Sequence, residues 1–146
     1  MPKLILLKGL PGSGKSTYAK NLIDLDDSFQ RVNRDEIRHM MTNYKFSKKN
    51  EKIVTGVVRA AVRQCFMYGL NIVIDETSIN PKVERDFRLM VLDWNSENPY
   101  MHYDFVLDDS FLDVSLDECL RRNALRESPV PEDVIRRMNS NLVAGA

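Results

Sequence analysis

Short strand-like runs alternate with longer stretches of helical spacing along this chain. The runs lie near residues 3–8, 29–32 and 70–75, and the last of these is the clearest. Continuous apolar runs are typical of buried parallel strands, and their alternation with helices predicts an α/β fold with helices on both faces of a central parallel sheet. Residues 100–114 fit either one strand with a break at 108–110 or two strands joined by a turn there.

Residue signals mark several helix ends. Asn33 is placed to cap a helix with Glu36 in the reciprocal position, Gly69 stops another helix, and Pro81 opens a third. The expected helices cover residues 16–25, 33 onward, 51–68, 81–94, 116–127 and 132–142. The apolar spacing predicts these inward-facing residues: Tyr18, Ala19, Leu22, Ile23, Ile37, Met40, Met41, Ile53, Val57, Val58, Ala61, Val62, Cys65 and Phe66.

Composition narrows the class of protein. With 146 residues, 43% hydrophobic and 29% charged, the chain is expected to form one domain over residues 1–146. The formal net charge is zero, so an anionic partner would have to be held by a local patch. The N-terminus lacks a signal-peptide pattern and no stretch is long enough to span a membrane, so we expect a cytoplasmic protein without a membrane partner.

A phosphate loop lies between the first strand and the first helix. Residues 9–17 read Gly-Leu-Pro-Gly-Ser-Gly-Lys-Ser-Thr, a full G-x-x-x-x-G-K-S motif. In such a loop the backbone N–H groups surround a nucleotide's phosphates, the lysine reaches the outer phosphates, and the serine hydroxyl binds Mg²⁺. The motif therefore predicts a nucleotide and Mg²⁺ as ligands, held by Gly12, Ser13, Gly14, Lys15, Ser16 and Thr17.

The phosphate loop alone does not separate a kinase from a switch GTPase or a motor ATPase. The chain contains no Asn-Lys-x-Asp motif to read guanine, and it is too short for a typical motor module. A kinase for a small molecule or a nucleic acid remains. Such an enzyme needs a group that accepts or orients the acceptor hydroxyl, a Mg²⁺ environment, and cations around the transferring phosphoryl group.

Three carboxylates are candidates for this chemistry. Asp35 follows the second strand on the first turn of its helix, and ligands of such sheets sit at the carboxyl ends of strands. It is the best candidate base, although an acidic residue also suits the positive end of a helix. Asp75 ends an apolar strand, as a Walker-B carboxylate does, or it starts a solvent-facing turn. Glu76 follows it, and which of the two faces the site stays open because neighbours on a strand point opposite ways.

Two groups of basic residues have alternative readings. Arg122 and Arg126 are four positions apart on an expected helix, which could act as a lid over the nucleotide or present a solvated face where Glu118 pairs with Arg122. A second group interleaves with Tyr44 and Phe46, which suits single-stranded nucleic acid. It equally fits the solvated side of a helix and its loop. Its members are Arg38, His39, Lys45, Lys48, Lys49, Lys52, Arg59 and Arg63.

These motifs resemble the kinase domain of the T-even phage 5′-hydroxyl polynucleotide kinase family over nearly the whole chain. The Asn-Arg-Asp-x-x-x-Arg and Tyr-Lys-(aromatic)-(Ser/Thr)-Lys-Lys patterns are its most specific parts. The resemblance implies a P-loop kinase fold with strand order 2-3-1-4 and a helical lid near the C-terminus. The matching segments are residues 9–17, 32–38, 44–56, 75–81, 120–123 and 130–138.

The resemblance also implies residue roles. Lys15 and Ser16 would hold ATP phosphates and Mg²⁺, and Asp35 would be the general base for the 5′-hydroxyl. Arg38 would bind the phosphate next to that nucleoside, and Arg126, with Arg122 nearby, would engage the donor phosphates from the lid. The family's 3′-phosphatase activity is not expected, because the chain stops after the last kinase helix.

The family's carboxylate before its threonine aligns with Glu76 rather than Asp75. The expected substrate side therefore comprises Asp35, Arg38, Asp75, Glu76 and Thr77, with a metal role for Asp75 left open. The resulting hypothesis is transfer of the ATP γ-phosphoryl group to the 5′-hydroxyl end of DNA or RNA. The alternatives are a kinase for a nucleoside, metabolite or antibiotic, and an ATP-binding module without catalysis.

Overall fold

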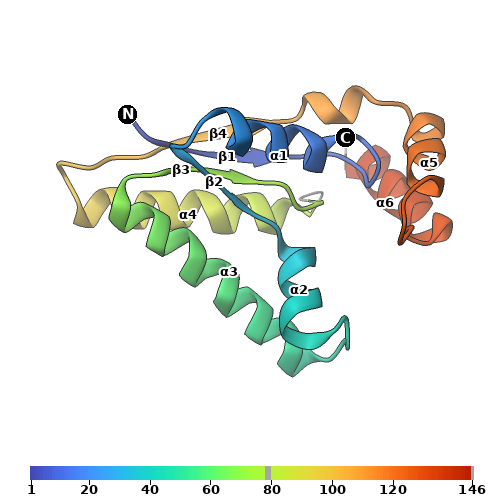
Figure 1. Cartoon of the computed structure of the whole chain (residues 1–146), viewed down its shortest axis with the longest axis horizontal. Helices are drawn as coiled ribbons and strands as arrows, with labels where there is room; N and C mark the ends of the chain where they lie inside the picture. Colours follow the sequence, from blue (N-terminus) through green and yellow to red (C-terminus); the bar gives the residue numbers. More distant parts are fainter. Residues whose placement is uncertain (78–79, 146) are drawn as a thin grey trace.

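A four-stranded parallel sheet forms the centre of the molecule. The computed structural model describes residues 1–77 and 80–145. The sheet contains β1 (Lys3–Leu7), β2 (Phe29–Val32), β3 (Asn71–Ile74) and β4 (Asp104–Asp108) in the order β2-β3-β1-β4 (Figure 1). Every neighbouring pair is parallel, with Leu4 opposite both Ile72 and Phe105. The predicted fold class and strand order are confirmed.

Helices cover both faces of this sheet because alternate strand residues point to opposite sides. Leu4, Leu6 and Ile74 face one side, where they pack with α3 (Lys48–Tyr68) and α4 (Pro81–Glu97). Ile5, Leu7 and Val73 face the other side, where α1 (Lys15–Leu25) contributes Ala19. Figure 1 shows α1 above the sheet and α3 and α4 below it.

Capping residues fix several helix ends. Asn33 caps α2 (Arg34–Thr42) by accepting a hydrogen bond from the Glu36 backbone N–H, as expected. Ser47 caps α3 in the same way, so this helix begins at Lys48 and not at residue 51. Gly69 ends α3 with a φ of 65°, a left-handed conformation that favours glycine. Pro81 opens α4, which extends to Glu97 rather than to residue 94.

Residues 100–114 form one strand, β4, followed by the short 3₁₀ helix η1 (Ser110–Asp113). The strand ends at Asp108 because its carboxylate accepts hydrogen bonds from the backbone N–H and hydroxyl of Ser110, which turns the chain. The sequence pattern had left one strand and two strands equally open. The short turn after Asp108 brings η1 back against the phosphate loop.

Four predicted inward-facing residues are exposed: Tyr18, Met40, Met41 and Ile53. On α3, Val58, Val62, Cys65 and Phe66 are buried as predicted, and Val54 rather than Ile53 is the buried residue of the first turns. α2 packs mainly on α3 and has no buried residue of its own. Ile37 of α2 packs against the core, while Met40 and Met41 remain in solvent.

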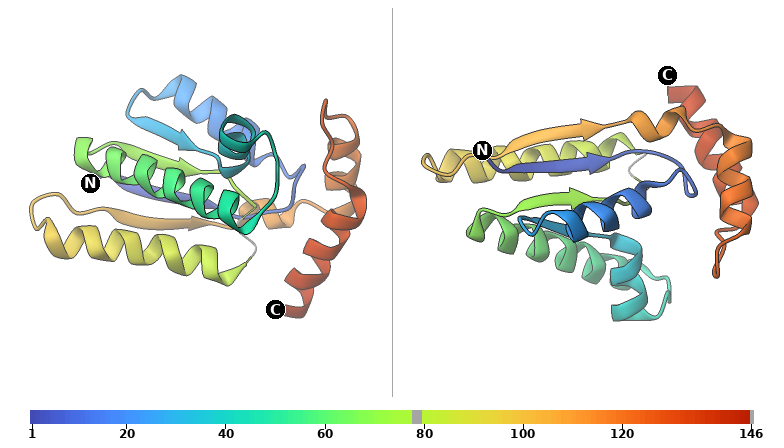
Figure 2. Two further views of the ribbon diagram at one scale, coloured as in Figure 1. Left: turned by 90° about the horizontal axis from the view of Figure 1, so that it is seen from below. Right: turned by 45° about the horizontal axis from the view of Figure 1, so that its top comes forward.

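The lid consists of α5 (Leu116–Ala124) and α6 (Glu132–Gly145), which stand at the carboxyl ends of the strands (Figure 2). α5 ends at Ala124, not at residue 127. The buried Asn123 side chain exchanges hydrogen bonds with the backbone of Val130 at 2.7 and 3.0 Å, which turns the chain after α5. The prediction that Arg122 and Arg126 share one helix is therefore wrong, because Arg126 lies after the helix.

The segment 75–81 that contributed to the resemblance includes residues 78 and 79, which lie outside the described residues. In the part of the chain that the structure describes, no helix is long and apolar enough to cross a membrane.

Candidate active site

The phosphate loop connects β1 to α1 and bends around the side chain of Lys15. Gly12 and Gly14 adopt φ values of 85° and 101°, which only glycine adopts without strain. The Lys15 ammonium donates hydrogen bonds to the carbonyls of Gly9 at 2.6 Å and Leu10 at 3.0 Å. Burial lowers the pKa of Lys15 to about 8, although the nearby Asp75 carboxylate works in the opposite direction. The ammonium is thus held inside the loop, where phosphates would meet it.

The lid helix lies directly against this loop. A Cβ atom on Gly12 would lie 2.4 Å from the Cys119 carbonyl oxygen of α5. A Cβ on Gly9 would lie 2.8 Å from the Phe111 Cβ atom of η1. Glycine at both positions therefore allows η1 and α5 to pack closely against the phosphate loop. A larger residue in the loop is expected to displace the lid.

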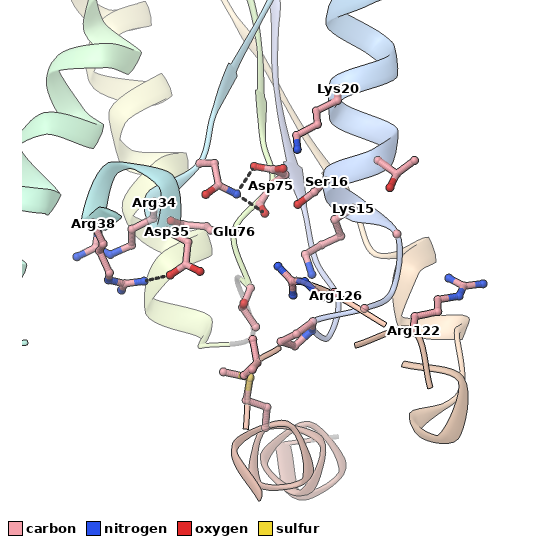
Figure 3. A pocket seen from close by; sticks show the side chains of 18 residues that line it. Lys15, Ser16, Lys20, Arg34, Asp35, Arg38, Asp75, Glu76, Arg122 and Arg126 are labelled. Atoms are coloured by element: carbon pink, nitrogen blue, oxygen red, sulfur yellow. Dashed lines mark hydrogen bonds and ion pairs between the residues drawn. The ribbon is translucent and has the colours of Figure 1, made fainter. Parts of the chain in front are cut away.

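A cavity of about 590 Å³ lies between the phosphate loop, the carboxyl ends of β2 and β3, and the lid (Figure 3). It brings together every predicted site residue except Ser13, which is buried beside it. Within residues 1–77 and 80–145, the Ser13 hydroxyl has no hydrogen-bond partner. The cavity is lined by Pro11, Gly12, Gly14, Lys15, Ser16, Thr17, Lys20, Asn33, Arg34, Asp35, Arg38, Asp75, Glu76, Thr77, Arg122, Arg126, Val130 and Met138.

Asp35 and Arg38 form one side of the cavity. Both lie on the first turns of α2, and Arg38 Nη1 donates a 3.1 Å hydrogen bond to Asp35 Oδ1. The Asp35 carboxylate is 60% exposed, so an incoming group can reach it. Arg38 is also held by Glu51 of α3, through contacts of 2.9 and 3.1 Å from Nη2 and Nε. These hydrogen bonds raise the pKa of Arg38 and lower the pKa of Glu51, so the pair stays ionised.

Asp75 and Glu76 both line the cavity, but Asp75 is more strongly constrained. Its buried carboxylate accepts hydrogen bonds from Arg31 Nε and Asn33 Nδ2, each at 2.8 Å. Burial raises the pKa of Glu76, while the positive charges of Arg34 and Arg38 oppose that rise. Figure 3 shows Asp75 facing Ser16 and Lys15, and Glu76 on the side of Asp35.

The lid contributes cations to the opposite side of the cavity. Arg122 of α5 pairs with Glu118 at 2.9 Å and reaches the Ser13 carbonyl with Nη1 at 3.3 Å. The predicted surface pair with Glu118 is present, and the same guanidinium also contacts the phosphate loop. Figure 3 shows Arg126 close to Lys15.

Sequence reasoning missed several supporting residues. Arg31 and Glu51 hold Asp75 and Arg38, while Arg34 and Lys20 line the cavity. Arg34 Nη2 also donates to the Thr55 hydroxyl at 2.7 Å. Arg34 lies inside the Asn-Arg-Asp segment and could have been suspected there. The sequence offers one indication that Glu51 supports the site, because it is the single acid among the basic residues between positions 38 and 63.

The arrangement suits phosphoryl transfer. Lys15, Arg122 and Arg126 give positive charge around the phosphate loop, and a carboxylate faces them from α2. The hydroxyl of Ser16 and the carboxylate of Asp75 are hard oxygen donors, the kind that Mg²⁺ prefers together with phosphate oxygens and water. Asp75 already accepts two hydrogen bonds but keeps lone pairs for a metal-bound water, so these residues fit a magnesium site.

Fold and site define a P-loop protein with the architecture of nucleotide-dependent kinases. A model of the AAA domain family matches residues 4–144, nearly the whole chain. The chain belongs to this family of P-loop nucleotide-binding domains.

Three relatives are informative about the branch of this family. A protein of Autographa californica nuclear polyhedrosis virus, assigned as a bifunctional polynucleotide kinase/RNA ligase, is 28% identical over 143 residues, which span 88% of this chain and 19% of the viral protein. A solved chain of the Pnkp1/Rnl/Hen1 RNA repair complex is 27% identical, with a TM-score of 0.72 over 98% of this chain and 44% of its own. A second structure of the Pnkp1/Rnl/Hen1 complex gives 28% identity and a TM-score of 0.68, over 89% and 41% of the two chains.

This chain therefore spans less than half of each solved chain and about a fifth of the viral protein. The similar region in each relative has about the length of the sheet and lid of this chain.

Proposed function

We propose that residues 1–146 act as one ATP- and Mg²⁺-dependent kinase domain that phosphorylates the 5′-hydroxyl end of DNA or RNA. The observation that carries this proposal is the placement of Asp35 and Arg38 across one cavity from Lys15 and Arg126. The names of the relatives, a polynucleotide kinase/RNA ligase and an RNA repair complex, support the choice of a polynucleotide as acceptor.

On the donor side, the loop amides and Lys15 would hold the phosphates of ATP, with Arg122 and Arg126 closing over them. Their positive charges lie where negative charge spreads in the transition state. Catalysis by such a site depends mainly on position. The cavity keeps the γ-phosphoryl group between the cationic side and Asp35, so that attack and departure can be in line.

On the acceptor side, Asp35 would accept the proton of the 5′-hydroxyl while the hydroxyl oxygen forms a bond to the γ-phosphorus. The bond from the γ-phosphorus to the bridging oxygen breaks, and ADP leaves with that electron pair. Arg38, one helical turn away, would bind the phosphate on the 3′ side of the same nucleoside. An acceptor nucleoside with a free 5′-hydroxyl and a 3′-phosphate would contact Asp35 through the hydroxyl and Arg38 through the phosphate.

Ser16, with Asp75 through a bound water, would hold Mg²⁺. The ion, when bound, supplies charge neutralisation at the β- and γ-phosphate oxygens. Arg31 and Asn33 would keep the Asp75 carboxylate turned towards this position.

Label transfer from γ-labelled ATP tests the proposal. The acceptors are single-stranded DNA and RNA oligonucleotides with a free 5′-hydroxyl, and the control is the same oligonucleotide already carrying a 5′-phosphate. We expect label only on the free 5′ ends, and the DNA and RNA rates give the preference. If neither oligonucleotide is labelled while a nucleoside or small metabolite is, the acceptor part of the proposal is wrong.

A further inference from the structure

The far end of the α2–α3 hairpin carries an apolar surface that the cavity does not explain. This end, the α2–α3 tip, comprises residues 39–53 (Figure 1). Phe46 is 83% exposed and Tyr44 is 57% exposed. Single exposed apolar residues are ordinary, but a cluster within one short segment points to a binding surface. The exposed large apolar side chains of the tip are Met40, Met41, Tyr44, Phe46 and Ile53.

The same segment is strongly basic. Between residues 38 and 53 the sequence has one acid, Glu51, and that carboxylate is bound to Arg38. The whole chain is electrically balanced, with 21 basic and 21 acidic residues, so this local excess is a feature of the tip itself. A surface that combines exposed aromatics with uncompensated cations fits a polyanion whose units also stack. The cations are Lys45, Lys48, Lys49 and Lys52.

The backbone holds Tyr44 in an uncommon conformation. Asn43 and Tyr44 have φ values of 49° and 61°, in the left-handed region that aromatic residues rarely adopt. The Tyr44 ring stacks on His39 with centroids 5.0 Å apart and planes 5° apart. Asn50 Nδ2 stabilises the turn with a 2.8 Å hydrogen bond to the Lys45 carbonyl. A costly turn that presents a stacked aromatic pair to solvent suits a base-stacking surface.

The direction of α2 links the tip to the cavity. Asp35 is on the first turn, Arg38 one turn further along, and Asn43 at the end. If the 5′-hydroxyl lies at Asp35 and the first phosphate at Arg38, the strand heads along α2 towards the tip. The rise from Asp35 to Asn43 is about 12 Å at 1.5 Å per residue. That distance corresponds to roughly three or four nucleotides at a stacked spacing of 3.4 Å.

We propose that the α2–α3 tip binds the single-stranded polynucleotide a few nucleotides 3′ of the acceptor end. Bases stack on Tyr44 and Phe46, and the lysines of the tip contact the backbone phosphates. This inference rests on the proposed function, and it adds that the acceptor must be a strand of several nucleotides to bind at full affinity. Acceptors too short to reach the tip gain no affinity from it.

Acceptor length provides the test. Apparent KM values are measured at saturating ATP for a dinucleotide and for a 12-nucleotide single strand, with wild-type protein and with the Tyr44→Ala/Phe46→Ala variant. We expect the variant to raise KM for the 12-nucleotide acceptor by about tenfold or more, since stacking contributes this much per base. KM for the dinucleotide and kcat for both acceptors should stay within twofold. Tyr100→Ala, at a fully exposed tyrosine between α4 and β4, is the matched control and should change neither acceptor.

Salt dependence tests the charged part of the tip. Removing two phosphate contacts with Lys48→Ala/Lys49→Ala should flatten the plot of log affinity against log salt for the 12-nucleotide strand by about 1.4. The control is Lys3→Ala, because Lys3 is the first residue of β1, at the end of the strand away from the phosphate loop. This variant should leave the slope unchanged. Fluorescence anisotropy of a labelled strand gives these affinities without turnover.

The outcomes separate this proposal from the proposed function. If wild-type protein phosphorylates both acceptors and Tyr44→Ala/Phe46→Ala leaves KM for the longer one unchanged, the tip proposal is overturned while the kinase assignment stands. If wild-type protein labels no 5′-hydroxyl oligonucleotide but labels a small acceptor, both fall together.

Discussion

Arg31 Nε donates a 2.8 Å hydrogen bond to Asp75 Oδ2, which ties β2 to the residue directly after β3. The Asp75 side chain is completely buried and that of Arg31 is 9% exposed, so the pair is almost free of water. Asp75 and Glu76 both line the cavity, and they differ in how firmly they are held. Asp75 is fixed beside the phosphate loop, and Glu76 lies towards Asp35.

Breaking this pair should destabilise the fold. Arg31→Ala leaves the Asp75 carboxylate buried without its ion-pair partner, which costs about 3–5 kcal/mol of unfolding free energy. Urea unfolding followed by circular dichroism measures the loss. Arg136→Ala, which removes an exposed partner of Glu132, should cost less than about 1 kcal/mol. Equal losses in the two variants would contradict the role assigned to the buried pair.

Glu51 should act as a positioning residue for Arg38. Glu51→Gln keeps the size of the side chain but removes the charge that holds the guanidinium, so Arg38 loses its fixed orientation. We expect about a tenfold rise in the apparent KM for a 5′-hydroxyl oligonucleotide, with a smaller change in kcat and none in the affinity for ATP. Steady-state kinetics with each substrate varied in turn measures these quantities.

Glu84→Gln is the matched control for Glu51→Gln. Glu84 makes a comparable contact with Arg88 on α4, away from the cavity. It should change neither KM. A Glu51→Gln protein with wild-type KM for the oligonucleotide would show that Arg38 does not need this partner.

Nucleotide affinity should depend on pH through Lys15. Its pKa of about 8 in the free protein means that the ammonium is charged below pH 8 and loses its proton above that value. ATP phosphates favour the charged form, so affinity is full below pH 8 and falls by up to about tenfold per pH unit above it. Isothermal titration with ATP between pH 6.5 and 9.5 measures this curve. Lys15→Arg should bind less tightly but with a flat profile over the same range, because arginine stays protonated.

Gly12→Ala should damage the phosphate loop and the lid together. The new Cβ would lie 2.4 Å from the Cys119 carbonyl oxygen, and alanine is strained at a φ of 85°. We expect ATP affinity to fall by more than tenfold while the sheet stays folded. Gly56→Ala is the opposite case, since nothing lies within 4 Å of its Cβ position on α3. It should raise the unfolding free energy by about 0.5–1 kcal/mol and leave ATP binding unchanged.

The sequence predicted those features that depend on local pattern. The phosphate loop, the strand order and the Asn33 cap follow from short motifs and from a family resemblance. Features that depend on which elements pack together were harder to predict. Met40 and Met41 have helical apolar spacing, but α2 packs mainly on α3, and these two side chains remain in solvent.

Contacts between distant segments could not be predicted either. Arg31 and Asp75 are 44 positions apart, and Arg38 and Glu51 are 13 apart on different helices. The end of α5 depends on Asn123 binding the backbone seven residues later, which spacing alone does not reveal. The site was therefore predicted as a set of residues, and the contacts that orient them came only with the structure.

The rate of label transfer by Asp35→Asn tests the central claim most directly. The substitution keeps the shape of the side chain and removes the carboxylate that would accept the proton of the 5′-hydroxyl. The account predicts a fall of at least about a hundredfold in the single-turnover rate with a 5′-hydroxyl oligonucleotide, with ATP affinity within twofold of wild type. Transfer at the wild-type rate by a folded Asp35→Asn protein would contradict the account.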